Sequence, residues 1–283
     1  MTLARSKQSA SGDRPWLARL LAQRRTLVMG ILNVTPDSFS DGGRFLEPAL
    51  AIAQGERMMT EGADIIDLGA ESTRPYGGAV SVPLADELAR LAPVLPRLAE
   101  IGAAISIDTT KAEIAAYALD AGARMVNDVW GLQRDPDMAR LVAQRDVPIV
   151  IMHNRDTAEA SIDIMADIEA FFTRSLAIAE GAGVARDRIV LDPGIGFGKT
   201  PEQSIAVLAR LDRLRAFELP LLVGASRKRF IDKVSPAPPD RRLGGSLAAH
   251  LCAVAHGARI IRAHDVAETV QALQVAAALR EAR

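Results

Sequence analysis

The chain has 283 residues, of which 49% are hydrophobic, and its formal net charge is -1 at pH 7. This length permits two domains, but it is also typical of a single (β/α)8 barrel of about 250 residues. The balanced charge argues against a nucleic-acid-binding protein, which would carry a basic surplus. No apolar run reaches the roughly 18 residues that span a bilayer. The only cysteine, Cys252, cannot form an internal disulfide and suits the reducing cytoplasm.

The first 25 residues contain six Arg or Lys and one Asp, without the apolar core of a secretory signal. An Arg- and Ser-rich start of this kind is also compatible with a transit peptide. We expect residues 1–25 to be a tail that is flexible or forms a short helix at WLARLL. Residues 26–283 are then expected to form one barrel domain.

Eight short hydrophobic runs alternate with segments rich in Ala, Leu, Glu and Arg. The runs are Leu27–Leu32, Asp64–Leu68, Ala104–Ile107, Arg124–Val126, Val147–Met152, Ile189–Leu191, Leu219–Val223 and Arg259–Ile261. Continuous apolar runs are typical of parallel strands that are buried on both faces. We therefore predict an α/β fold, a single (β/α)8 TIM barrel.

Helices are predicted between these runs and at the end of the chain. They cover Pro48–Glu61, Leu84–Glu100, Lys111–Asp120, Asp137–Gln144, Asp163–Ala182, Pro201–Arg215, Gly245–His256 and Val266–Ala282. Long Gly-, Ser- and Pro-rich loops follow the first two strands, at Thr35–Phe45 and Ala70–Pro83. In this fold the loops after the strands surround the active site.

Polar residues stand where several strands end. They are Asn33, Asp108, Asn127, His153, Asp192 and Arg262. Asp108 has a structural alternative, because it precedes a helix that it could cap. His153 fits a satisfied core histidine as well as it fits a ligand. Several buried carboxylates at one barrel mouth indicate a ligand with hydrogen-bond donors, or a metal.

Cations follow the last two strands, at Ser226–Arg229 (SRKR), Arg262 and His264. This is where phosphate sites are frequent in the fold, so we expect an anion site there. The stretch GIGFGK at Gly194–Lys199 resembles a phosphate loop but lacks the P-loop spacing. The histidine spacing disfavours zinc, whereas Mg²⁺ needs only one or two protein oxygens.

The motifs resemble those of the dihydropteroate synthase family from Leu27 to the last helix. They read GILNVTPDSFSDGG from Gly30, ESTRP from Glu71, IDT from Ile107, NDV from Asn127, MH at Met152, DPGIGFGK from Asp192, SRK from Ser226 and RAHD from Arg262. The family condenses (7,8-dihydropterin-6-yl)methyl diphosphate with 4-aminobenzoate, releasing pyrophosphate. The resemblance implies this activity in folate biosynthesis, with Mg²⁺ as cofactor, sulfonamides as inhibitors and a cytoplasmic homodimer as the assembly.

The resemblance also assigns roles to particular residues. It implies Asp108, Lys228 and Arg262 as catalytic residues and Asn33 as the magnesium contact. The implied substrate-binding residues are Thr73, Pro75, Asp108, Asn127, Met152, Asp192, Phe197, Gly224, Ser226, Arg227, Lys228, Arg262, Ala263 and His264. Asp192 would accept the pterin N–H edge, while Arg262, Ala263 and His264 would hold the diphosphate. Pro75, Ser226 and Arg227 would contact 4-aminobenzoate.

The stretch after His153 reads NRDT, which departs from the family pattern and leaves its contacts open. Two other functions share parts of this pattern. A pterin-binding methyltransferase barrel that takes methyltetrahydrofolate would have the Asp- and Asn-tipped strands, without needing the SRK and RAHD cations. A catalytically silent relative would lose a loop or a charged site residue, and all of these are present in the sequence.

Overall fold

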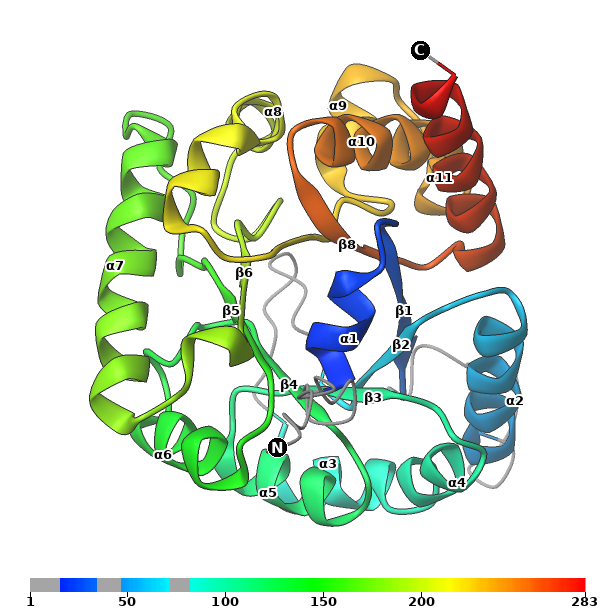
Figure 1. The fold of residues 1–283 in the computed structure, drawn as a ribbon, viewed down its shortest axis with the longest axis vertical. Helices are drawn as coiled ribbons and strands as arrows, with labels where there is room; N and C mark the ends of the chain where they lie inside the picture. Colours follow the sequence, from blue (N-terminus) through cyan, green and yellow to red (C-terminus); the bar gives the residue numbers. More distant parts are fainter. Residues whose placement is uncertain (1–15, 35–46, 72–81, 283) are drawn as a thin grey trace, which may run out of the picture.

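The structure is a computed structural model that describes residues 16–34, 47–71 and 82–282. Eight parallel strands pair in chain order and close into a barrel. Helices surround the strands (Figure 1). The strands are β1 (Leu27–Asn33), β2 (Ile65–Gly69), β3 (Ile105–Asp108), β4 (Met125–Asp128), β5 (Ile149–Met152), β6 (Ile189–Asp192), β7 (Leu221–Val223) and β8 (Ala258–Ala263). The predicted (β/α)8 barrel is confirmed.

The predicted helices occur in the predicted order, with differences at several boundaries, and the helix at Arg229–Val234 was not predicted. The helices are α1 (Trp16–Ala22), α2 (Glu47–Thr60), α3 (Leu84–Leu91), α4 (Leu95–Glu100), α5 (Ala112–Asp120), α6 (Pro136–Arg145), α7 (Ile164–Ala182), α8 (Pro201–Ala209), α9 (Arg229–Val234), α10 (Leu243–Ala255) and α11 (Val266–Glu281). Short 3-10 helices are η2 (Arg186–Arg188), η3 (Leu211–Phe217) and η4 (Pro239–Arg241). Within the described parts of the chain, no helix is long and apolar enough to cross a membrane.

Two of the predicted helices are wrong in extent. The segment Leu84–Glu100 forms α3 and α4 rather than one helix. Pro93, which lies between them, lacks the N–H that a continuous helix would need, and so does Pro96 in the first turn of α4. The segment Pro201–Arg215 leaves the α-helical conformation after Ala209. Its remainder belongs to η3, where the buried Leu211 and Leu214 are three residues apart, the repeat of a 3-10 helix.

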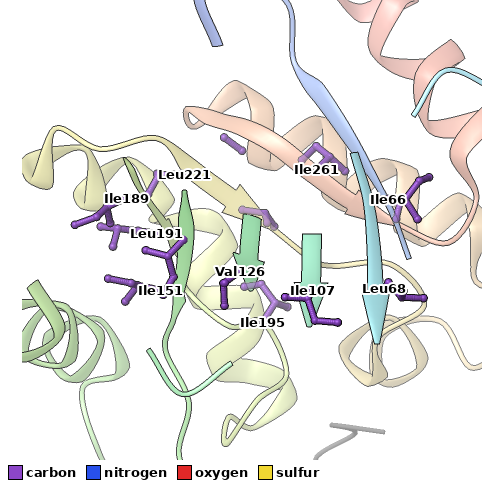
Figure 2. Close-up of a cluster of buried hydrophobic side chains, with 14 of the residues drawn as sticks. Ile66, Leu68, Ile107, Val126, Ile151, Ile189, Leu191, Ile195, Leu221 and Ile261 are labelled. Atoms are coloured by element: carbon purple, nitrogen blue, oxygen red, sulfur yellow. The ribbon is translucent and has the colours of Figure 1, made fainter. Parts of the chain in front are cut away.

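One half of the strand side chains faces outward and packs against the surrounding helices. Because successive residues of a strand point to opposite faces, every second residue belongs to this layer. The layer includes Ile66, Leu68, Ile107, Val126, Ile151, Leu191 and Ile261, which Figure 2 shows as one cluster. Helical partners such as Leu98, Phe172 and Leu208 are also buried in it. This layer is the main hydrophobic core.

The other half points into the barrel. Those inward side chains that lie near the beginnings of the strands form a second apolar cluster. The cluster contains Leu27, Met29, Ile65, Met125, Val150, Val190, Leu222 and Ile260, and α1 adds Leu17. Leu17 is 1% exposed. Figure 1 shows α1 over the centre of the barrel. The helix at WLARLL therefore closes the barrel end at which the strands begin.

Candidate active site

The inner face of the barrel changes from apolar to polar along several of the strands. Two residues after an apolar inward position, the next inward side chain is charged or an amide. The pairs are Ile65 and Asp67, Met125 and Asn127, Val190 and Asp192, and Ile260 and Arg262; in β3 the pair is Ser106 and Asp108. The polar members are buried, with Asp67, Asn127 and Asp192 at 0%, 3% and 4% exposure. The C-terminal half of the barrel interior is therefore a polar chamber.

Arg262 links three strands inside this chamber. Its Nε donates to Asp67 Oδ2 at 2.6 Å, and its Nη2 donates to Asp108 Oδ2 at 2.8 Å. Asp67 Oδ2 also accepts from Asn127 Nδ2 at 2.9 Å. One guanidinium thus balances two buried carboxylates, which would otherwise be strongly destabilising. Arg262 keeps a side-chain exposure of 16%, so it remains reachable from the barrel mouth.

Several buried acceptors of the chamber lack a hydrogen-bond donor within the described residues. They are Asp67 Oδ1, Asp108 Oδ1 and Asn127 Oδ1. Burial raises the pKa of Asp108 to about 7, although Arg262 opposes the shift. Unpaired buried acceptors are costly, so their presence on three neighbouring strands indicates a bound group that supplies donors.

Asp192 lies at the end of β6, where its Oδ1 accepts a hydrogen bond from the Gly194 N–H at 2.7 Å. Burial raises the pKa of Asp192 to about 6 against this hydrogen bond and against nearby Lys228. The Lys228 ammonium lies 4.0 Å from the centre of the Phe197 ring. A carboxylate, a cation and an aromatic face therefore meet at one place.

An apolar wall accompanies these charged groups. Val129, Met152 and Phe197 form a small buried cluster, and Trp130 packs against it. The predicted wall residues Met152 and Phe197 are thus brought together from different strand ends. A flat, apolar ligand face would fit beside them.

The structure shows what the glycines and the lysine of the GIGFGK stretch contact. The Lys199 ammonium is buried and contacts the carbonyls of Gly194 and Phe197 and the ring of His153. A Cβ at Gly194, where φ is 65°, would lie 1.9 Å from the His153 carbonyl oxygen. The glycines therefore allow this loop to approach the backbone after β5, and Lys199 is directed inward and not toward a phosphate.

His153 is a satisfied core histidine, which settles the two alternatives for this residue. It has no exposed surface, and its ring nitrogens contact Asp167 Oδ2 at 2.9 Å and Lys199 Nζ at 2.6 Å. Burial, and then the Lys199 charge, lower its pKa to about 3. The ring is therefore neutral at physiological pH.

The predicted cation site after β7 and β8 is held by internal hydrogen bonds. Ser226 Oγ lies 3.0 Å from His264 Nδ1 and accepts from the His264 N–H at 3.3 Å. Burial, and then Arg262, lower the pKa of His264 to about 3, so it would meet an anion as a neutral N–H donor. The Arg227 guanidinium makes a two-point ion pair with Asp265, with Nε 3.1 Å from Oδ2.

Asn33 ends β1 in register with Gly69, which is itself in register with Asp108. Gly69 leaves a space between these neighbours. A Cβ there would lie 3.5 Å from Asn33 Oδ1 and 3.7 Å from Asp108 Oδ2. The described residues contain no group of three His, Cys, Asp or Glu that could hold a metal. Two oxygens at one gap nevertheless suit an Mg²⁺ ion that keeps water and substrate phosphates as its other ligands.

Two predicted substrate contacts fall outside the described residues. Thr73 and Pro75 belong to residues 72–81, and the first long loop belongs to residues 35–46. Gly224, by contrast, is described and lies over Arg262. A Cβ at Gly224 would be 3.7 Å from Arg262 Cβ and 3.8 Å from Arg262 Cδ, so the glycine leaves room beside the stem of this side chain. The backbone of Ala263, buried next to it, pairs with Gly30 of β1.

A hydrogen-bonded clamp joins the two residues that flank positions 72–81. Glu71 Oε1 accepts from the Val82 N–H at 3.1 Å. Lys111 Nζ donates to Glu71 Oε2 at 2.7 Å and to the Val82 carbonyl at 2.9 Å. No role for these side chains was predicted from the sequence. Their separation of up to 40 positions along the chain explains why no local pattern shows them.

Sequence reasoning also missed Asp67, Asp128 and Asp265. Asp67 left a readable signal, because it is a charged residue inside an otherwise apolar strand, two positions before Gly69. Asp128 accepts from the N–H groups of Trp130 and Leu132 and orders the turn after β4. Asp265, in the RAHD motif, had no assigned partner until the fold placed it beside Arg227.

The site combines a barrel mouth lined by Asp and Asn, an aromatic wall and a group of cations. This combination defines a class of enzyme that binds a flat, polar heterocycle with an anionic tail. Comparison with known proteins agrees. The family described as pterin binding enzyme matches residues 29–264. The chain therefore belongs to the pterin-binding enzyme family, in the branch of the dihydropteroate synthases.

Proteins similar to this chain include several dihydropteroate synthases. The dihydropteroate synthases of Bacillus subtilis and of Synechocystis are 45% and 46% identical to the chain, covering 86% and 90% of it and 85% and 91% of their own lengths. A Clostridium difficile dihydropteroate synthase, solved in the presence of pteroic acid, superposes with a TM-score of 0.87 at 47% identity over 90% of this chain and 97% of that one. A Xanthomonas albilineans enzyme with 4-aminobenzoic acid gives 0.87 at 44% identity over 91% and 94%.

Proposed function

We propose that this chain joins 4-aminobenzoate to (7,8-dihydropterin-6-yl)methyl diphosphate. The amine nitrogen forms a bond to the methylene carbon, the carbon–oxygen bond to the diphosphate breaks, and the amine loses a proton. The products are 7,8-dihydropteroate and pyrophosphate. The polar chamber carries this proposal, because Asp108, Asn127 and Asp192 offer buried acceptors that match the N–H edge of a pterin.

Pterin recognition would divide between a polar rim and an apolar wall. Asp192 would accept two N–H groups of the ring, since a carboxylate forms short, charge-assisted hydrogen bonds with such an edge. Asn127 and Asp108 would form hydrogen bonds with other ring atoms, and Lys228 would face the ring carbonyl. Met152 and Phe197 would cover one face of the ring. These roles are supported by the shared position of the side chains at the barrel mouth.

The diphosphate would leave at the end of the chamber formed by β1 and β8. Stabilising its developing charge is the main electrostatic task of the reaction. Arg262, the backbone at Ala263 and neutral His264 supply N–H donors there. Asn33 would contact Mg²⁺, which neutralises phosphate charge when bound. Asp108, already paired with Arg262, would stabilise positive charge that develops on the pterin.

The second substrate would bind beside Ser226 and Arg227. Arg227 is paired with Asp265 in the described chain, so it would offer its exposed guanidinium edge to the benzoate. Thr73 and Pro75 are proposed to complete the diphosphate and 4-aminobenzoate contacts. We also infer a homodimer and a cytoplasmic location, the latter in keeping with the single Cys252 in α10.

A coupled assay tests the proposal directly. Purified protein is incubated with the pterin diphosphate, 4-aminobenzoate and Mg²⁺, and both pyrophosphate and dihydropteroate are measured. Product should form only when all three are present, and EDTA should abolish it. A methyltransferase would instead bind methyltetrahydrofolate in preference to the diphosphate. Absence of both products under these conditions would show the proposal to be wrong.

A further inference from the structure

The loop after β6 holds a buried lysine that the proposed reaction does not use. All residues from Asp192 to Lys199 are buried, and Lys199 is only 2% exposed. A lysine ammonium in the interior is costly unless hydrogen bonds and nearby carboxylates compensate. The compensating groups of Lys199 therefore indicate what this residue stabilises.

The Lys199 ammonium has three acceptors, which equals its number of N–H groups. It lies 2.9 Å from the Gly194 carbonyl, 3.1 Å from the Phe197 carbonyl and 2.6 Å from His153 Nδ1. Two of these acceptors belong to the loop itself, and the third belongs to the segment after β5. The ammonium thus ties the loop to the neighbouring strand end.

The rest of the network fixes His153 in one tautomer. Since His153 Nδ1 accepts from the ammonium, the ring proton is on Nε2 and is donated to Asp167 Oδ2 at 2.9 Å. The ring also meets Phe171 edge-on at 4.9 Å. Asp167 Oδ1 is paired with Arg155 Nη1 at 2.9 Å. The NRDT stretch, which departs from the family pattern, thereby supplies a residue of this network.

The same loop carries two proposed pterin contacts on its other side. The Gly194 N–H donates to Asp192 Oδ1 at 2.7 Å, while the Gly194 carbonyl contacts Lys199. The Phe197 N–H donates to the Gly194 carbonyl at 3.0 Å, and its ring lies against Lys228 and Met152. Lys199 therefore restrains the backbone that places the Asp192 carboxylate and the Phe197 ring.

We propose that Lys199 is a positioning residue for pterin recognition, acting through Asp192 and Phe197, with neutral His153 as its third acceptor. The proposal rests on the proposed function of the site. Misplacement of a binding group by about 1 Å can reduce activity roughly 100-fold, so the effect should be measurable. A purely structural role predicts lower stability with unchanged selectivity between the two substrates.

The first test uses Lys199→Met, which keeps the length of the side chain and removes its donors. We expect the KM for the pterin diphosphate to rise roughly 10- to 100-fold. The KM for 4-aminobenzoate, measured at saturating pterin diphosphate, should stay within about threefold, because Lys199 does not touch that subsite. A folded Lys199→Met protein whose pterin KM is within twofold of the unaltered chain would overturn the proposal.

A double-mutant cycle with Asp192→Asn shows whether Lys199 acts through the carboxylate. If it does, the double variant should lose much less pterin affinity than the product of the two single losses. Fully additive losses would contradict the assigned route. Leu17→Ala, at the opposite end of the barrel, is the matched control for lost stability, and its pterin KM should stay unchanged.

A second pair of variants decides the question if Lys199→Met does not fold. His153→Gln keeps an acceptor for Lys199 and a donor for Asp167, whereas His153→Phe keeps only the ring shape. We expect pterin affinity near that of the unaltered chain for Gln and a loss of about tenfold for Phe. Equal affinities in the two variants would overturn the proposal. Failure of the unaltered chain to bind the pterin diphosphate would instead reject the proposed function itself.

Discussion

Asp67 is the residue whose position explains the charge arrangement of the site. It is fully buried inside β2 and shares Arg262 with Asp108. Arg262 was predicted as a diphosphate contact at a strand end, and it has a second, internal role as the counter-ion of two carboxylates. Its position in the ion pairs orients the guanidinium before substrate arrives, and such preorganised charge is effective in a water-poor site.

Asp192 gives a prediction about pH. Burial raises its pKa to about 6, and only the ionised carboxylate can accept two N–H groups of the pterin. The contribution of Asp192 to pterin affinity should therefore be constant above about pH 6 and fall up to tenfold per pH unit below it. Calorimetry from pH 5 to pH 8 measures this for the unaltered chain and for Asp192→Asn.

Comparison with the variant isolates one group, since Asp108 and Asp128 titrate in both proteins. Asp192→Asn should bind weakly at every pH, and the ratio of the two affinities should shrink as the pH falls. A ratio that does not change with pH would mean that another group causes the dependence.

At the scale of elements, the contact between α10 and α11 contains a second buried histidine. His250 is 1% exposed, and its Nδ1 lies 3.5 Å from Thr269 Oγ1. Its Nε2 has no partner in the described structure. Burial lowers the pKa of His250 to about 4 from 6.5, so the folded protein holds the ring neutral.

This shift makes the helix pair sensitive to acid. A lowered pKa contributes stability that is present above pH 6.5 and is lost as the pH falls toward 4, because the unfolded chain binds the proton more tightly. Between pH 7 and pH 5 the loss from His250 is about 2 kcal/mol. When the pH is lowered from 7 to 5, the free energy of unfolding of His250→Leu should therefore rise by about 2 kcal/mol relative to that of the unaltered chain. Urea unfolding of both proteins at pH 7 and pH 5 measures this change. If the difference in unfolding free energy between the two proteins is the same at both pH values, the lowered pKa of His250 is wrong.

Across the whole molecule, the barrel interior is divided into two ends with different tasks. The end where the strands begin is apolar and closed by α1, whereas the other end is polar and carries the site. Stability and binding are thus separated along the barrel axis, the usual arrangement of this fold.

Leu17→Ala tests the separation. Truncating a fully buried leucine costs roughly 2–5 kcal/mol of unfolding free energy, by lost burial and by the cavity that remains. Both KM values should stay close to those of the unaltered chain at a temperature where the variant is folded. Denaturant unfolding and steady-state kinetics measure the two effects. A raised pterin KM would show that the closed end influences the site.

The sequence by itself determined the barrel, because parallel strands that are buried on both faces are mostly apolar runs, and eight such runs end where polar loops begin. It also determined most of the proposed pterin site. Asp108, Asn127 and Asp192 each lie at or next to the last residue of a strand, and parallel strands bring their ends together. Its local patterns also predicted the helices, with three exceptions. They missed α9, they missed the break at Pro93 and Pro96, and they missed the change to a 3-10 helix after Ala209.

Only the tertiary structure decided the partners. Arg262 and Asp67 are 195 positions apart, and Lys199 and His153 are 46 apart, so their pairing depends on barrel closure and on the β5–β6 contact. The burial of individual side chains was also decided by the tertiary structure and not by the sequence alone. Only the fold keeps His153 neutral, directs Lys199 inward and places Leu17 at the closed end of the barrel. The reason is that the desolvation of a side chain depends on everything that surrounds it in space, and not on its neighbours in sequence.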